Sequence, residues 1–204
     1  MSIYYILELI CIIAFALSGV LVDSNRGKDL ISVMVLGWLT ALGGGTVRDV
    51  ILNEQVFWIR DQSYFWAALA SSLGGFFFIN HIRKSKIEKL ILLFDTIGVA
   101  LFSILVTERL ISGGYAPYIA VSMGTVTAIF GGVLRDIVAH RPTMFNNTEF
   151  YATPIIMGCC LYIVLNRFEV TDYIASPLCM LLIIIFRLFV VVKDIKFPRW
   201  LLLR

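Results

Sequence analysis

Two arginine–aspartate pairs lie inside apolar stretches of this sequence, each shortly after a run of glycines. Arg48 and Asp49 follow three glycines in "TALGGGTVRDV", and Arg135 and Asp136 follow two glycines in "TAIFGGVLRDI". Charges in an apolar medium pair with each other or border water, because an unpaired buried charge is costly. Glycines weaken a helix and can free main-chain carbonyls, which can replace the water around a small cation. The pattern predicts a polar path through an apolar region.

Composition identifies the apolar medium as a lipid bilayer. The 204-residue chain is 59% hydrophobic and 15% charged, which is far more apolar than a soluble domain. A spanning helix needs about 20 mostly apolar residues. Seven segments qualify: 3–22, 30–52, 62–80, 90–109, 115–139, 150–166 and 173–192. We expect an all-α membrane protein with seven transmembrane helices in a single transmembrane domain, 1–204. The four cysteines lie within apolar runs, which excludes a disulfide scaffold.

An internal repeat relates the two glycine motifs, which are displaced by 87 positions. The same displacement, without gaps, places Glu8 on Asp95. We interpret 1–82 and 88–168 as two copies of one unit, followed by a seventh helix and cytoplasmic tail at 172–204. A unit with three spans starts its second copy on the opposite side of the membrane. The repeat is therefore predicted to be inverted, an arrangement in which interrupted helices of transport proteins meet near the midplane.

The glycines predict interruptions at matching places in the second and fifth helices. Each glycine costs about 1 kcal/mol in a helix interior relative to alanine. Kinks are expected at Gly43, Gly44 and Gly45 and at Gly131 and Gly132. The alternative is that these small residues let two helix backbones approach closely.

The charged residues are expected to pair within each repeat. At ~1.5 Å rise per residue, the two arginines lie about 10 Å from the midplane on opposite sides, too far apart to exchange partners. The predicted pairs are Arg48 with Glu8 or Asp49, and Arg135 with Asp95 or Asp136. These pairs could be purely structural, could take part in conduction, or both.

Hydroxyl groups near the glycines indicate the kind of ion such a path would pass. Ser18, Thr40, Thr46 and Thr127 are the expected contributors, with Ser122 and Thr125 nearby. Hydroxyls and carbonyls suit a monovalent cation, whereas no ring of spare carboxylates favours a divalent one. We expect transient K⁺ or Na⁺, with no resident metal and no cofactor. Each hydroxyl could instead bond to its own helix.

Basic residues in the loops predict orientation. One side receives Arg26, Lys28, Arg83, Lys84, Lys86, Lys89, Arg141, Lys193, Lys196, Arg199 and Arg204, and the other only Arg60, Arg109 and Arg167. We expect the protein in the inner (plasma) membrane. The positive-inside rule then places its N-terminus outside and its C-terminus in the cytoplasm. The segment "HIRKSKIEK" could also attract anionic lipids. The net charge of +3 gives no indication of nucleic-acid binding, because the basic residues anchor loops.

The doubled motif resembles a known family. "GGGTVRD" and "GGVLRD", in a seven-helix chain of about this length, are similar to the bacterial branch of the trimeric intracellular cation channel (TRIC) family. The resemblance implies a homotrimer in which each subunit has its own pore, kinked at the glycines and passing potassium and sodium. Eukaryotic members are similar but have a lysine-bearing motif in the fourth helix, which "LLFDTIGVALFSI" does not contain.

Two other functions compete with a channel. A secondary carrier of a small amino acid such as glycine would use the same inverted repeat, and close bacterial relatives of the family have been labelled glycine transporters. A membrane enzyme is not expected, because His81 and His140 lie at span ends without a nucleophile or a metal constellation.

Overall fold

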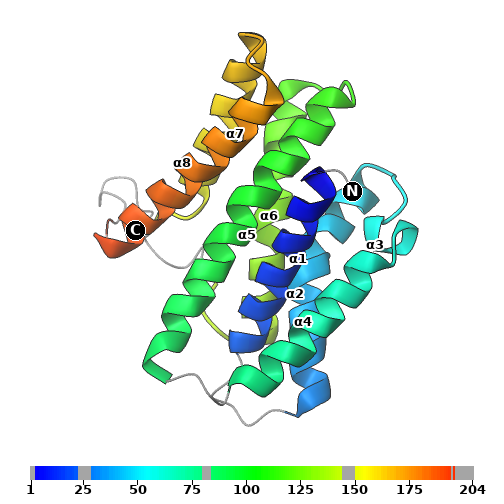
Figure 1. Ribbon diagram of the computed structural model, residues 1–204, viewed down its shortest axis with the longest axis vertical. Coiled ribbons are helices and arrows are strands. Elements are labelled where there is room, and N and C mark those ends of the chain that lie inside the picture. Colours follow the sequence, from blue (N-terminus) through cyan, green and yellow to red (C-terminus); the bar gives the residue numbers. More distant parts are fainter. Residues whose placement is uncertain (1–2, 23–28, 80–83, 144–149, 194, 196–204) are drawn as a thin grey trace, which may run out of the picture.

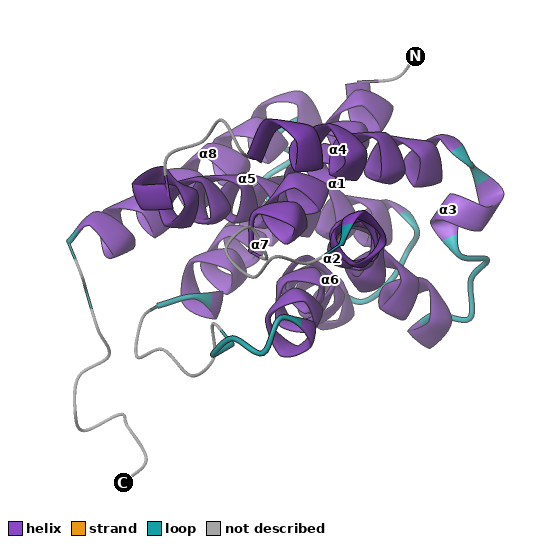
Figure 2. Ribbon diagram, turned by 90° about the horizontal axis from the view of Figure 1, so that it is seen from below, coloured by secondary structure: helices purple, strands orange, loops and turns teal. Residues whose placement is uncertain are grey.

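The computed structural model describes residues 3–22, 29–79, 84–143, 150–193 and 195. Every element in these ranges is a helix or a loop (Figure 2), which confirms the all-α class. The described ranges hold eight helices (Figure 1): α1 (Ile3–Val22), α2 (Leu30–Ile51), α3 (Phe57–Arg60), α4 (Ser63–Ile79), α5 (Lys84–Ser112), α6 (Pro117–Val138), α7 (Ala152–Arg167) and α8 (Asp172–Val192). Seven of them overlap the predicted segments, with ends that differ by several residues in α5, and α3 is an additional short helix.

Five of these helices are long and apolar enough to cross a bilayer: α1, α2, α5, α6 and α8. The apolar helices α4 and α7 are shorter, with 17 and 16 residues. At ~1.5 Å per residue they extend about 25 Å, slightly less than a typical hydrocarbon core. The chain is thus a multi-pass membrane protein, and the crossing of all seven long helices stays a prediction.

Local sequence explains where the central helices begin and end. Asp29 caps α2, where its carboxylate accepts the Ser32 backbone N–H at 3.0 Å. Pro117 opens α6, at the helix position where a missing N–H costs nothing. Beyond the last turns of α2 and α6, Asn53 and His140 adopt φ of 55° and 49°. Both residue types tolerate this left-handed region better than most. The two ends are displaced by 87 positions, so the helices terminate in the same way.

The packing places α5 at the centre of the bundle, between α1 on one side and α7 and α8 on the other (Figure 1). Helix α1 also packs on α2 and α4, and α2 packs on α6. Phe15 of α1 meets Phe102 of α5, its own repeat equivalent, with ring centroids 6.2 Å apart. Helix α8 packs on α5 and α7 and on no other described helix.

Candidate functional site

The centre of the candidate site is the crossing of α2 and α6. A Cβ added to Gly44 would overlap the main-chain oxygen of Thr127, and one added to Gly131 would overlap that of Thr40. Thr40 of α2 contacts Gly131 of α6, and Gly44, four residues later in α2, contacts Thr127, four residues earlier in α6. The two helices therefore run antiparallel. The contacts are reciprocal at a displacement of 87 positions, as an inverted repeat requires. Glycine is needed here because no side chain fits between the backbones.

The interruption expected at the glycines is not found. Helix α2 is continuous from Leu30 to Ile51, and α6 is continuous from Pro117 to Val138. The alternative reading, close packing through small residues, describes the neighbours of the other glycines as well. A Cβ on Gly43 would lie 2.7 Å from Leu134, one on Gly45 2.5 Å from Phe57, and one on Gly132 3.1 Å from Asp95. Packing across the crossing therefore offsets the low helix propensity of glycine. A bend without loss of helix stays a prediction.

The first charged cluster, the repeat-one cluster, consists of Glu8, Arg48, Asp49 and Tyr64. Arg48 donates from Nε to Asp49 Oδ1 at 2.7 Å, and both side chains are buried. The other oxygen of Asp49 accepts the backbone N–H of Phe57 at 2.8 Å, which holds the start of α3. Tyr64 of α4 donates its hydroxyl to Glu8 of α1. Helix α2 thus presents an internally paired arginine at its C-terminal end, where the helix dipole favours a cation.

The second cluster, the repeat-two cluster, consists of Asp95, Arg135, Asp136 and Tyr151. Arg135 donates to Asp136 at 2.9 Å, to Asp95 at 3.0 Å and to the hydroxyl of Ser18. Tyr151 donates to Asp95 at 3.2 Å, matching the Tyr64–Glu8 bond of the other repeat. Since α2 and α6 are antiparallel, the two clusters lie at opposite ends of the crossing.

The prediction that each arginine pairs within its own repeat is confirmed. Arg48 pairs with Asp49, and Arg135 pairs with both Asp95 and Asp136. Glu8 is bonded to Tyr64 instead, although its charge is close enough to act on Arg48. Sequence reasoning missed both tyrosines, even though they fall on each other at the repeat displacement.

Arg187 of α8 is a further member of the site, and no motif of the sequence indicates it. An arginine near a helix end is expected to extend to the membrane surface, whereas this side chain is 3% exposed. Its Nη2 pairs with Asp95 Oδ2 at 3.1 Å, and its guanidinium lies over the Tyr151 ring, 4.3 Å from the centroid. The partner lies 92 positions away in sequence, so no local pattern indicates the pair.

Two of the predicted hydroxyl groups are bonded to their own helices. Thr40 donates to Leu36 at 2.6 Å, and Thr46 donates to Leu42 at 2.7 Å. Ser18 accepts from Arg135, and Thr125 Oγ1 and Thr127 Oγ1 are buried without a hydrogen-bond partner among the described residues. These bonds support the alternative for Thr40 and Thr46, whereas Thr127, whose main chain contacts Gly44, keeps an unpaired hydroxyl at the crossing.

A cavity of about 320 Å³ opens beside Glu8. It is lined by Tyr4, Glu8, Leu105, Glu108, Arg109, Ser112 and Asp172. Three of these residues are carboxylates and one is an arginine, which also pairs with Glu54 at 2.7 Å. The cavity therefore carries an excess of negative charge, which favours cations over anions. Within the described residues, no group of three or more His, Cys, Asp or Glu side chains has the arrangement to hold a metal ion. His81 lies outside these residues.

Sequence comparison finds relatives over nearly the whole chain. A family model described as "Glycine transporter" matches residues 5–80 and 92–167, two stretches displaced from each other by the same 87 positions. The UPF0126 inner membrane protein YadS of Escherichia coli (strain K12) is 32% identical over 200 residues, which cover 97% of this chain and 96% of the relative. A UPF0126 membrane protein of Deinococcus radiodurans is 36% identical over 155 residues, covering 74% and 71%.

Structural comparison finds the same architecture in solved channels. A TRIC trimeric intracellular cation channel orthologue from Rhodobacter sphaeroides has a TM-score of 0.90 at 30% identity, covering 96% of this chain and 100% of that chain. A structure reported as the basis for conductance through TRIC cation channels has a TM-score of 0.83 at 28% identity over both full chains. A TRIC channel from C. elegans with bound Ca²⁺ has a TM-score of 0.65 at 12% identity, which shows the shared fold alone.

Proposed function

Because this chain belongs to the bacterial TRIC-like family, which includes the UPF0126 membrane proteins, we propose that it is a potassium-permeable channel for monovalent cations. The observation that carries the proposal is the antiparallel crossing of α2 and α6 with one buried charged cluster at each end. Charged groups at such depth in a membrane protein are costly even when paired, and they commonly mark a path for ions or water.

The proposed path follows the α2–α6 crossing from one charged cluster to the other. Main-chain contacts at Gly44 and Gly131 close the crossing in the described structure. Ion passage therefore requires the two helices to separate or bend, and the glycines are where they have least side-chain packing to lose. Thr127 would offer its unpaired hydroxyl to an ion there, while the paired arginines limit how many cations occupy the path.

The assembly and orientation are also proposed. We place one pore in each subunit of a homotrimer, by likeness to the trimeric Rhodobacter sphaeroides channel. The N-terminus lies outside and the C-terminus inside the inner membrane, because basic residues concentrate in one set of loops. Several of these residues, namely Arg26, Lys28, Arg83, Lys196, Arg199 and Arg204, lie outside the described part of the chain. Anionic lipids would contact that side.

A second candidate function is transport of glycine. The description of the matching family model favours it, and an inverted repeat serves carriers as well as channels. The buried arginines could bind the carboxylate of an amino acid. In the structure, however, Arg48 and Arg135 are already paired with carboxylates of the protein itself.

Reconstitution separates the two functions. Purified protein is incorporated into planar bilayers with a KCl gradient, and in parallel into liposomes supplied with labelled glycine. A channel gives discrete unitary currents that reverse near the potassium equilibrium potential and vanish when a large organic cation replaces potassium. Saturable glycine uptake in liposomes, without unitary currents in the bilayer, would show the carrier and refute the channel. Protein-free membranes serve as the control.

A further inference from the structure

Among the described residues, Asp95 is the one carboxylate of the two repeats that forms ion pairs with two arginines. Its side chain is fully buried on α5. Oδ1 accepts from Arg135 at 3.0 Å, and Oδ2 accepts from Arg187 at 3.1 Å. Arg135 belongs to the same repeat as Asp95, whereas Arg187 comes from α8, beyond the second repeat.

The equivalent carboxylate of the first repeat has a different environment. Glu8 is partly exposed, accepts the Tyr64 hydroxyl and borders the negatively charged cavity of about 320 Å³. The position 87 residues before Arg187 is Ala100, so the first repeat has no arginine equivalent to Arg187. Glu8 borders a cavity that Arg109 also lines, whereas Asp95 is enclosed by its pairs with Arg135 and Arg187.

The two arginines on Asp95 are held unequally. Arg135 has three partners, namely Asp95, Asp136 and Ser18. Arg187 has Asp95 and the ring of Tyr151, while its Nη1 is buried without a hydrogen-bond partner in the described residues. A buried donor without a partner costs free energy, so Arg187 is the more easily displaced of the two.

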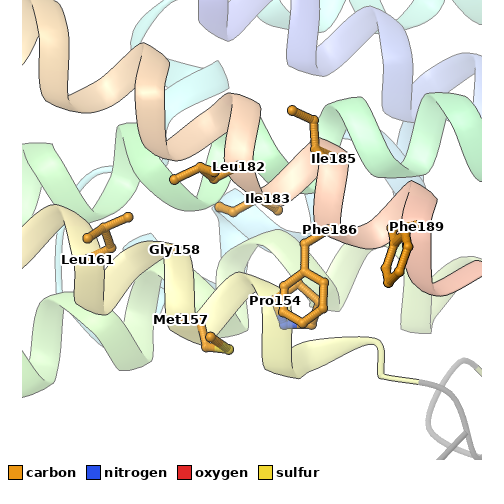
Figure 3. Close-up of a pocket in the computed structure, with 9 residues that line it drawn as sticks. All are labelled: Pro154, Met157, Gly158, Leu161, Leu182, Ile183, Ile185, Phe186 and Phe189. Carbon is orange, nitrogen blue, oxygen red and sulfur yellow. The ribbon is translucent and has the colours of Figure 1, made fainter. Parts of the chain in front are cut away.

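The helix that carries Arg187 has few helical neighbours. Helix α8 packs only on α5 and α7 among the described helices. An apolar hollow of about 440 Å³ lies between α7 and α8 (Figure 3), where Phe186 and Phe189 flank the position of Arg187 on the α8 chain. Side-chain packing between α7 and α8 is therefore incomplete beside this part of α8, although the two helices touch at Gly158 and Ile183.

We propose that Asp95 is a cation site masked by Arg187, a tethered guanidinium that a permeant cation must displace to pass this end of the crossing. The inference rests on the proposed channel function. With Arg187 in place, the two arginines balance Asp95 and Asp136. With Arg187 withdrawn, the cluster keeps one excess negative charge, which a potassium ion can neutralise. Arg187 is thus a positioning residue that acts through Asp95.

The test is the potassium concentration at which unitary conductance half-saturates in planar bilayers. Removing the masking charge in R187Q should lower that concentration at least about fivefold, the low end of what one coupled pair supplies. R187K keeps a cation of different geometry and should give a smaller change in the same direction. The double variant R187Q/D95N lacks the carboxylate and should return close to the wild-type value. R141Q is the matched control, because it removes a charge from a partly exposed pair with Glu88; it should leave the value unchanged.

Each outcome decides the proposal. An unchanged or raised half-saturating concentration in R187Q would overturn it, as would an equal effect in R187Q/D95N, since a purely structural role does not depend on the Asp95 charge. If R187Q does not yield monodisperse protein, the test uses R187K. A half-saturating potassium concentration of R187K equal to that of the wild type would then count against masking. Wild-type protein without potassium currents would instead refute the channel function, and the masked site with it.

Discussion

Replacing Gly44 or Gly131 with alanine adds a methyl group where two helix backbones touch. The new Cβ of the first variant would overlap the Thr127 carbonyl oxygen, and that of the second would overlap the Thr40 carbonyl oxygen. A carbonyl within a continuous helix cannot rotate away, because its neighbours are tied by hydrogen bonds. Relief therefore requires α2 and α6 to move apart, which loosens the packing on both sides of the crossing.

The size of the effect follows from two opposing terms. Alanine is about 1 kcal/mol more favourable than glycine in a helix interior. Forcing a methyl group into a packed contact costs about 1–3 kcal/mol, and the upper value applies at a rigid main-chain atom. We expect each variant to lose about 2 kcal/mol of stability. Gly74 of α4 is the matched control, because nothing lies within 4 Å of an added Cβ. There the helix term stands alone, and Gly74→Ala should gain about 1 kcal/mol.

The measurement is the apparent Tm of purified protein in detergent, followed by loss of the monodisperse peak on size exclusion. Gly44→Ala and Gly131→Ala should fall below the wild type by similar amounts, since their contacts are reciprocal, and Gly74→Ala should rise above it. If Gly44→Ala is as stable as Gly74→Ala, the close-contact argument fails, and the glycines serve helix flexibility instead.

The remaining predictions concern two tyrosine hydroxyls and one helix cap. Tyr64→Phe removes the donor to Glu8 and should cost about 1.5–3 kcal/mol, as for a hydrogen bond to a charged group; Tyr151→Phe should cost less, because Asp95 keeps its two arginines. Equal losses in the Tm of the two variants would contradict this reasoning. Ser32 donates its hydroxyl and its backbone N–H to the Asp29 carboxylate, and these hydrogen bonds lower the pKa of Asp29 below the usual value. The stability from this cap should be complete above the ordinary carboxyl pKa and be lost as pH falls through the lower folded value. The Tm difference between the wild type and Asp29→Asn, followed against pH, should shrink in acid, and a difference that grows there would count against the cap.

Apolar length predicts the helices well because bilayer-sized segments stand out from the polar loops between them. Helix α5 is longer than expected, since Lys86, Glu88 and Lys89 at its start favour helix but give no hydropathy signal. Helix α3 is not predictable from apolar length, because it has four residues and begins at a backbone N–H that the distant Asp49 carboxylate accepts.

The charged site is predictable in part. The repeat places Asp95 beside Arg135, and the structure pairs them. Tyr64 and Tyr151 are also 87 positions apart, so an alignment of the two halves beyond the motifs would have matched them. Arg187 has no such signal, because α8 lies outside the repeat and its contact with Asp95 arises only from the packing of α8 on α5.

The contact between Phe15 and Phe102 has a consequence for the axis that relates the two halves. A residue and its repeat equivalent can touch only close to the pseudo-twofold axis, because rotation about that axis carries one onto the other. The two rings, with centroids 6.2 Å apart, therefore mark where the axis passes between α1 and α5. Both rings belong to the hydrophobic core, so the duplication turns about a dry point of the molecule.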